Sequence, residues 1–170
     1  MDTEYTAEKI KLSDSWKNKF TVFQKLGGSE RSFHDMTSSP EYKALTSKER
    51  RIITFNFWAF FFSSLYYFSK KMWAKGAIIM GCGFLWAAIL TIIETVLKIA
   101  PLPNPVYWTP SAVFCGMMAN YDYFRMVYTG EKMWTRLPAF LGTFLGAAGF
   151  ILLAFIMVIL AASQQTIPVS

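Results

Sequence analysis

Histidine and cysteine are scarce in this chain, which has one His and two Cys among its 170 residues. Metal and redox sites need several such ligands at short spacing, and neither a CxxC nor an HExxH motif is present. Walker-loop, dinucleotide-binding and GxSxG patterns are also missing. We therefore expect no cofactor, no metal site and no catalytic residue, and we predict that the protein is not an enzyme. We interpret His34 as a loop residue, and Cys82 and Cys115 as buried apolar residues.

Charged residues are missing from two long segments, residues 77–93 and 137–170. Residues 1–51, by contrast, contain 10 of the 17 Lys and Arg and 8 of the 11 Asp and Glu. Hydrophobic residues make up 54% of the chain and aromatic residues 18%, more than the core of a small soluble domain needs. This pattern predicts a polar head over residues 1–51, a membrane domain over 52–162 and a polar tail over 163–170.

The net charge of +6 raises the question of a nucleic-acid partner. The head is nearly balanced, however, and its one basic cluster, KERR, directly precedes the membrane domain. Attraction to lipid headgroups explains such a charge better, so we expect a lipid bilayer and no nucleic acid as partner. The first fifty residues also contain no apolar run of signal-peptide length, and we expect the N-terminus to lie in the cytosol.

The head should consist of short helices. Trp16, Phe20 and Phe23 recur at helical spacing, and Gly27 with Gly28 forms a stop signal after them. The apolar face of this helix predicts packing against the rest of the protein, with docking on the membrane surface as the alternative. Two further helix starts follow in the sequence. Ser39 is a cap before Pro40 in the first helical position, and Thr46 with Glu49 has the spacing of a capping box.

Three segments have the composition of membrane-spanning helices. Residues 76–97 and 138–162 each supply the roughly 20 apolar residues that a helix needs to cross the hydrocarbon core. Residues 106–128 are apolar in their first half and polar in their second, which indicates a span whose end emerges at the headgroups. The fold class predicted is therefore an all-α integral membrane protein.

The segment over residues 52–70 is aromatic but short for a span. If it crossed the bilayer from a cytosolic head, six basic residues of the later loops would face outward, against the usual cytosolic bias of Lys and Arg. If it is interfacial or re-entrant, Lys98 is the only one on the outer side. We therefore predict one aromatic interfacial or re-entrant helix and three transmembrane helices, with four transmembrane helices as the alternative.

One face of this predicted helix is small and polar. Helical spacing places Asn56, Ala59, Ser63, Tyr67 and Lys70 in a single stripe, while the other faces are mostly aromatic. Small residues permit close helix contact, and a buried amide needs partners. We expect Asn56, Ser63 and Tyr67 to contact another helix.

Further contact residues lie in the later spans. If Asn120, with Tyr121 beside it, faces Asn56, the two amides would pair and hold the aromatic segment against the span over 106–128. Gly142 and Gly146 have GxxxG spacing and Gly149 follows one turn later, which favours close packing within the chain or in a homodimer.

Several charged and aromatic residues have simpler interpretations at the membrane surface. A Lys-Met-Trp sequence occurs twice, and we interpret its outer members as headgroup anchors: Lys71, Trp73, Lys132 and Trp134. Two pairs at helical spacing are interpreted as interfacial ion pairs, Glu94 with Lys98 and Asp122 with Arg125. Intramembrane acids are functional candidates in general, so these pairs also carry the alternative of a transport role.

The aromatic segment, the basic residues after it and the later Asn-Tyr-x-Tyr element share a pattern that consists of Asn56, Ala59, Phe60, Phe62, Tyr66, Tyr67, Lys71, Met72, Trp73, Lys75, Gly76, Asn120, Tyr121 and Tyr123. This pattern resembles the HrgC-like family of small bacterial membrane proteins, which carry a domain of unknown function. The resemblance implies placement in the inner membrane and no established activity.

The functional expectation follows from place and composition. Only the ends of the predicted spans carry polar residues. We therefore expect a non-catalytic adaptor that holds a protein partner, or organises the inner leaflet, from the cytosolic side. The alternatives are a transport or channel component and a membrane immunity-type protein.

Overall fold

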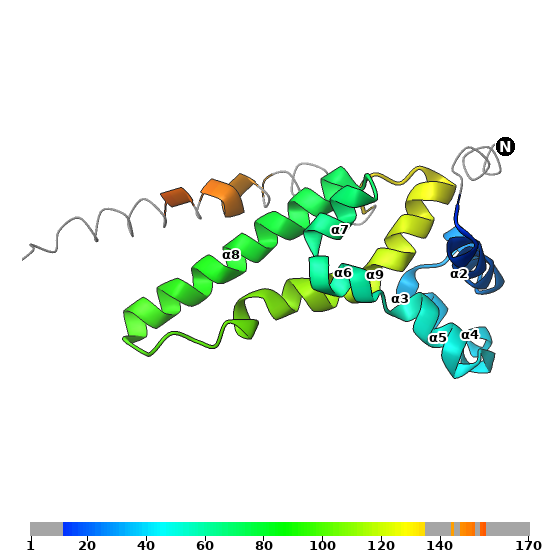
Figure 1. The fold of residues 1–170 in the computed structure, drawn as a ribbon, viewed down its shortest axis with the longest axis horizontal. Coiled ribbons are helices and arrows are strands. Elements are labelled where there is room, and N and C mark those ends of the chain that lie inside the picture. The colour runs from blue at the N-terminus through cyan, green and yellow to red at the C-terminus, as the bar shows by residue number, and fades with distance from the viewer. Residues whose placement is uncertain (1–11, 135–143, 145–146, 152–153, 156–170) are drawn as a thin grey trace, which may run out of the picture.

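The computed structural model describes residues 12–134, 144, 147–151 and 154–155, and these residues form helices and no strands. The short elements come first and two long helices follow (Figure 1). In chain order they are α2 (Asp14–Lys25), η1 (Gly28–Glu30), α3 (Phe33–Ser38), α4 (Pro40–Ala44), α5 (Ser47–Thr54), α6 (Phe57–Phe62), α7 (Ser64–Ser69), α8 (Trp73–Leu97) and α9 (Pro105–Thr129).

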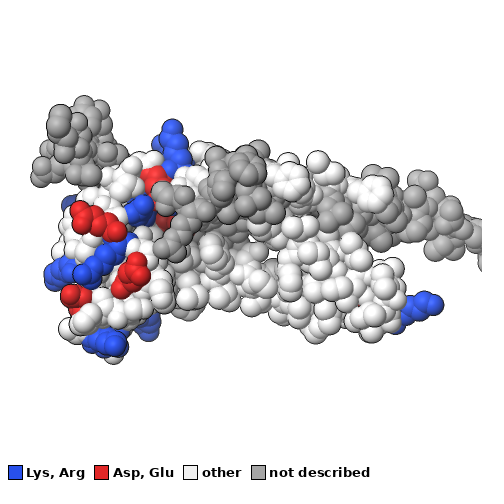
Figure 2. Space-filling model, turned by 180° about the vertical axis from the view of Figure 1, so that it is seen from behind, with Lys and Arg blue, Asp and Glu red and all other residues white. Residues whose placement is uncertain are grey.

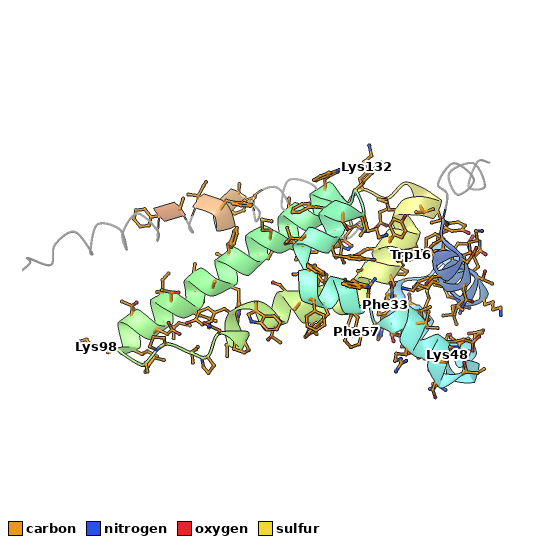
Figure 3. All side chains as sticks on the ribbon, in the orientation of Figure 1. Trp16, Phe33, Lys48, Phe57, Lys98 and Lys132 are labelled. Carbon is orange, nitrogen blue, oxygen red and sulfur yellow. The ribbon has the colours of Figure 1, made fainter. Side chains whose placement is uncertain are left out.

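The long helices α8 and α9 form a hairpin that leads away from the head and returns to it. Lys98 ends α8 in a left-handed conformation, with φ 52°. Pro105 then begins α9, where its missing N–H costs no hydrogen bond, and Gly130 ends that helix with φ 68°. Among the described residues, the tip of the hairpin, marked by Lys98, lies farthest from the short helices (Figure 3).

The predicted local signals of the head are present. The side chain of Ser39 accepts a hydrogen bond from the backbone of Tyr42, and Thr46 and Glu49 form the reciprocal capping box. Gly27, with φ 103°, follows the end of α2 in a conformation that other residues rarely adopt. Each signal satisfies backbone groups that a helix end would otherwise leave unpaired.

The head packs on α9 rather than standing apart from it. Phe20 and Phe23 of α2 are buried, and each contacts the ring of Phe124, at centroid distances of 5.3 and 5.0 Å. Helix α5 also contacts α9, so two elements of the head cover the same end of that helix. The predicted packing of the first head helix on the rest of the protein is confirmed.

The aromatic segment is two helices, and the prediction of one helix over residues 52–70 is wrong. Helix α6 begins after Asn56, and the chain breaks at Ser63, which has φ 45° and ψ −123°. Asn56 binds Asn120, and Tyr67 binds Asp122, only two residues farther along α9. Eleven residues of straight helix would separate Asn56 and Tyr67 by about 16 Å. The chain has to fold back between them, and it does so at Ser63.

The predicted stripe nevertheless faces the protein. Asn56, Ala59 and Tyr67 are buried, and Ser63 lies 3.5 Å from the sulfur of Cys115. Gly116 permits this close approach, since a Cβ there would lie 3.0 Å from the ring of Phe55 and 3.2 Å from Phe60. The opposite side exposes a row of large apolar residues, namely Phe57, Trp58, Phe61, Phe62 and Leu65.

One helix among the described residues, α8, is long and apolar enough to cross a membrane. Helix α9 does not pass this test, and most of the predicted span over 138–162 lies outside the described residues. The predicted number of three spans is therefore not confirmed.

Charge is concentrated at one end of the molecule. Acidic and basic side chains gather over the head in Figure 2, and the visible surface of the hairpin is almost free of them up to its tip. The exposed hairpin surface carries large apolar side chains instead, including Trp86, Ile92, Val96, Trp108 and Phe114.

Candidate functional site

Two adjoining clusters of buried polar groups lie where the head, the α6–α7 pair and the hairpin meet. They are centred on Asn120 and Asp122, both of which are completely buried on α9. Every buried side-chain nitrogen and oxygen of the described residues has a hydrogen-bond partner. A fully hydrogen-bonded buried cluster favours one arrangement of the helices. Any other arrangement would leave a polar group unpaired, at the full free-energy cost of its desolvation.

The first cluster contains the amide pair anticipated from the sequence. Asn56 donates from Nδ2 to Asn120 Oδ1 over 2.8 Å and to the Tyr66 hydroxyl over 2.9 Å. Its Oδ1 accepts from the backbone N–H of Ala59, so the same side chain caps α6. Asn120 Nδ2 donates to the backbone oxygen of Ile52, 3.0 Å away. The amide pair thus ties the end of α5 and the start of α6 to α9.

The second cluster is an ionic network around Asp122. Lys75 Nζ and Trp134 Nε1 both donate to Asp122 Oδ1 over 2.8 Å, and the Tyr67 hydroxyl donates to Oδ2 over 2.8 Å. Lys75 comes from α8, Tyr67 from α7 and Trp134 from the segment after α9. One carboxylate therefore joins three separate parts of the chain to α9.

Glu131 extends this network toward the head. Its carboxylate accepts from Lys75 Nζ over 2.7 Å and from Arg125 Nη2 over 2.7 Å. Burial raises the pKa of Glu131, but the hydrogen bonds and charges of Lys75 and Arg125 outweigh it, so the pKa lies below its usual range. Two cations and two carboxylates meet here, which leaves the network neutral overall.

The head is attached to the same part of α9 by backbone oxygens. Arg125 donates from Nη1 to the carbonyl of Ser29, and the Tyr121 hydroxyl donates to the carbonyl of Arg31 over 2.8 Å. Tyr121, predicted as a contact residue, therefore binds the η1 region of the head. These bonds fix the orientation of the head relative to the hairpin.

Neither predicted ion pair forms. Asp122 is completely buried and binds Lys75 on α8, whereas Arg125 is partly exposed and binds Glu131 after α9. Glu94 accepts from the Tyr107 hydroxyl and from the backbone N–H of Leu102 instead of binding Lys98. Lys98 follows the last turn in a left-handed conformation, outside the regular i,i+4 geometry that the prediction assumed.

The predicted anchors divide into exposed and engaged residues. Lys71 and Lys132 are exposed, and Trp73 is 63% exposed, as an anchor would be. Trp134 is partly buried and donates to Asp122, so its interpretation as a free headgroup anchor is wrong. Its indole N–H donates to a carboxylate inside the protein. The Lys-Met-Trp pattern that suggested an anchor contains no information about this partner.

Of the three glycines of the last predicted span, only Gly149 lies within the described residues; Gly142 and Gly146 lie outside them. A Cβ on Gly149 would lie 2.0 Å from the backbone oxygen of Gly81 on α8. The ring of Phe150, the residue after Gly149, lies 5.1 Å from the ring of Phe84, one turn after Gly81 on α8, measured between ring centroids. This surface of the last segment is therefore used inside the chain.

Lys75 and Glu131 were missed by the sequence reasoning, which placed both in loops. A signal for Lys75 was present, because a lysine directly before an uncharged apolar run of residues 77–93 needs an internal partner or the headgroup region. Glu131 gave no such signal. Its role depends on Gly130 turning the chain back toward α8.

The two polar clusters hold the helices in position, and their polar groups are hydrogen-bonded to one another or to the backbone. The described residues contain no group of three or more His, Cys, Asp and Glu side chains placed to hold a metal ion. A cavity of about 480 Å³ lies beside the network, lined by head residues and by Tyr121, Arg125, Glu131 and Trp134. The adjoining guanidinium of Arg125 is already bound to Glu131 and Ser29.

The described residues thus form an all-helical fold in which a small polar head packs on an apolar helical hairpin. The model of the family "Protein of unknown function (DUF2628)" matches residues 9–128. This is more than half of the chain, so the chain belongs to that family. The matched region contains the whole described head, the α6–α7 pair, α8 and nearly all of α9.

Two similar curated proteins are the "Uncharacterized protein YigF" of Salmonella typhimurium and that of Salmonella typhi. Each is 37% identical over 87 residues, which is 49% of this chain and 65% of the relative. The match thus leaves about a third of each relative uncovered. No solved structure matches the chain.

Proposed function

We propose that this chain is a non-catalytic adaptor of the bacterial inner membrane, which holds a protein partner at the cytosolic face. In this proposal α8, α9 and residues 138–162 cross the bilayer, and α6 and α7 lie in the inner headgroup region. The N-terminal head lies in the cytosol. The similar Salmonella proteins support a bacterial setting, whereas the resemblance to the HrgC-like family is not confirmed by the family match.

The distribution of charge and apolar surface supports the membrane placement. Exposed charged side chains gather over the head, while the hairpin surface up to its tip exposes large hydrophobic residues. Water would disfavour an apolar surface of this extent, whereas lipid accommodates it. Phe57 and Trp58 on α6 are 67% and 68% exposed, which suits residues that enter the headgroup and upper acyl region.

One observation carries the adaptor role: Arg125, a member of the neutral network, donates to the Ser29 carbonyl of the head, and Tyr121 beside the network donates to the Arg31 carbonyl. The members of the network bind one another and the backbone of the head, which stabilises one orientation of a cytosolic surface relative to the bilayer. A fixed orientation is what a docking platform requires. A head that served only as a flexible tether would not need a fixed orientation.

Site-specific crosslinking tests this role. A photoreactive residue at Lys48, which lies exposed on α5 (Figure 3), should capture a discrete protein in native membranes, identified by mass spectrometry. The matched probe at Phe57 should give lipid adducts and no such protein. Absence of protein adducts from Lys48 and from other exposed head positions would contradict the adaptor role.

Transport is the second candidate, because a buried Lys75–Asp122 pair on two hairpin helices is an arrangement used in proton and ion pathways. A proton or ion flux in proteoliposomes that disappears in Asp122→Asn would favour it over the adaptor role. Equal flux in protein-containing and empty vesicles would eliminate it.

A further inference from the structure

Two lysines approach a single tryptophan ring at the junction of the head and the α6–α7 pair. Lys19 Nζ on α2 lies 4.4 Å from the ring centroid of Trp16, and Lys70 Nζ, directly after α7, lies 5.2 Å from it. Lys70 is also 5.1 Å from the ring of Tyr123 and 5.8 Å from that of Tyr66. Figure 3 shows Trp16 on the side of α2 that faces α9.

These two ammonium groups have no anionic partner among the described residues. The acids that form ion pairs bind Lys17, Arg31, Lys75 and Arg125. Lys19 donates to the neutral amide oxygen of Asn120 over 3.1 Å. The aromatic faces attract both cations but leave their charge in place.

The surroundings make this uncompensated charge unfavourable. Burial lowers the pKa of Lys19, and the nearby charge of Lys70 lowers it further; burial also lowers the pKa of Lys70. Both side chains are only partly buried, so a ligand can reach them from outside. An anion that bound both would relieve their mutual repulsion.

The position of the pair indicates where such an anion comes from. Lys70 is followed by exposed Lys71 and by Trp73, which begins α8, the one helix of the described residues that is long and apolar enough to cross a membrane. The exposed aromatic residues of α6 precede it. In the proposed membrane orientation, this is the level of the inner-leaflet phosphates.

We propose that Lys19 and Lys70, with Trp16 and Tyr123 as the walls, form a binding site for the phosphate group of an anionic phospholipid. This inference rests on the membrane placement proposed above. The bound lipid would bridge the head to the α6–α7 pair, because the two lysines belong to different elements. Free phosphate offers the same chemistry to the site, and the two sources are separated by experiment.

The test is lipid binding by the purified full-length protein in neutral detergent. Phosphatidylglycerol, phosphatidylcholine and inorganic phosphate are titrated separately, and bound ligand is counted by native mass spectrometry. The variants are Lys19→Gln, Lys70→Gln and the double substitution, and the matched control is Lys17→Gln, an exposed lysine on the same helix as Lys19. Lys70→Arg keeps the charge and should retain binding.

Each lysine is expected to contribute about fivefold to the affinity for phosphatidylglycerol, as for a basic residue near an anionic surface. The single variants should bind it more weakly by that factor, and Lys17→Gln should bind as the unmodified protein does. The same lysine dependence with inorganic phosphate alone would assign the site to a soluble phosphate. Equal binding of phosphatidylglycerol by all variants, with no phosphate binding, would overturn the site.

The membrane placement and the phosphate site can be tested independently of each other. If the protein fractionates with membranes and still shows no lysine-dependent binding, the phosphate site is wrong and the membrane placement is unaffected. A change in melting temperature shared by both Gln variants and absent from Lys70→Arg would show that these lysines act through folding, which would also overturn the site.

Discussion

Lys75 Nζ lies 2.8 Å from Asp122 Oδ1, and neither side chain has any exposed surface. The two residues are 47 positions apart and belong to the two helices of the hairpin. This pair fixes the rotation of α8 against α9 at the end where the head attaches.

Removal of one charge of the pair should destabilise the protein strongly. Asp122→Asn leaves Lys75 with Glu131 as its one carboxylate partner, and breaking a buried pair costs about 3 to 5 kcal/mol. The free energy of unfolding in detergent measures the loss. The control Lys132→Gln removes an exposed lysine and should change it by less than about 0.5 kcal/mol.

Removal of both charges should cost less than the sum of the two single substitutions. In Lys75→Met with Asp122→Leu no uncompensated charge remains in the pair, although Tyr67 and Trp134 each lose an acceptor. A double-mutant cycle measures the coupling. Strict additivity would contradict a direct interaction between these side chains.

The amide pair should contribute to stability and leave membrane insertion unchanged. Asn56→Leu removes the cap of α6 and the hydrogen bond to Asn120, for a loss of about 1 to 3 kcal/mol. Asn120→Leu in the same protein tests the coupling between the two residues. Unchanged stability of Asn56→Leu would show that the contact does not hold the α6–α7 pair in place.

Gly149 should be intolerant of any side chain. A Cβ there would overlap the backbone of Gly81, so Gly149→Ala must separate the last segment from α8. Cysteines at Phe84 and Phe150, with Cys82 and Cys115 replaced by alanine, should crosslink within one chain and lose this crosslink on Gly149→Ala. Gly83→Ala, whose Cβ would approach only the Ser111 hydroxyl at 3.1 Å, is the control. A crosslink between two chains would favour the homodimer instead.

Stability should fall in acid partly through Glu131. Its pKa in the folded protein is lowered by Lys75 and Arg125 against the opposing effect of burial. Its contribution is therefore complete above the unfolded pKa of about 4.3, and it is lost as the pH falls through the lower folded value. Melting temperatures from pH 7 to pH 3 should converge for the unmodified protein and Glu131→Gln. The control is Glu30→Gln, which removes an exposed acid of the head.

The sequence predicted local features well, because each depends on a few neighbouring residues. The capping box at Thr46 and Glu49 and the stop after α2 require only spacing and residue type. The inward face of residues 56–70 followed from helical spacing, and it survives the break at Ser63 since both short helices keep that face on α9.

The partners of the charged residues could not be predicted in the same way. An i,i+3 spacing suggested Asp122 with Arg125, whereas the actual partner of Asp122 lies on another helix. The break at Ser63 arises from two contacts with α9 and not from a Gly or Pro in the sequence. The partner of Asp122 and the break at Ser63 both depend on contacts between residues far apart in the sequence. A local sequence pattern does not predict such contacts.

Topology tests the central claim, that a cytosolic head is fixed to a membrane hairpin whose tip lies outside. Single cysteines replace Ile99 at the exposed tip and Lys132 at the exposed head end, in a protein with Cys82 and Cys115 changed to alanine. A membrane-impermeant maleimide applied to spheroplasts should label Ile99→Cys at once and Lys132→Cys only after lysis. Labelling of Lys132→Cys from outside, with Ile99→Cys protected until lysis, would contradict the account and favour four spans.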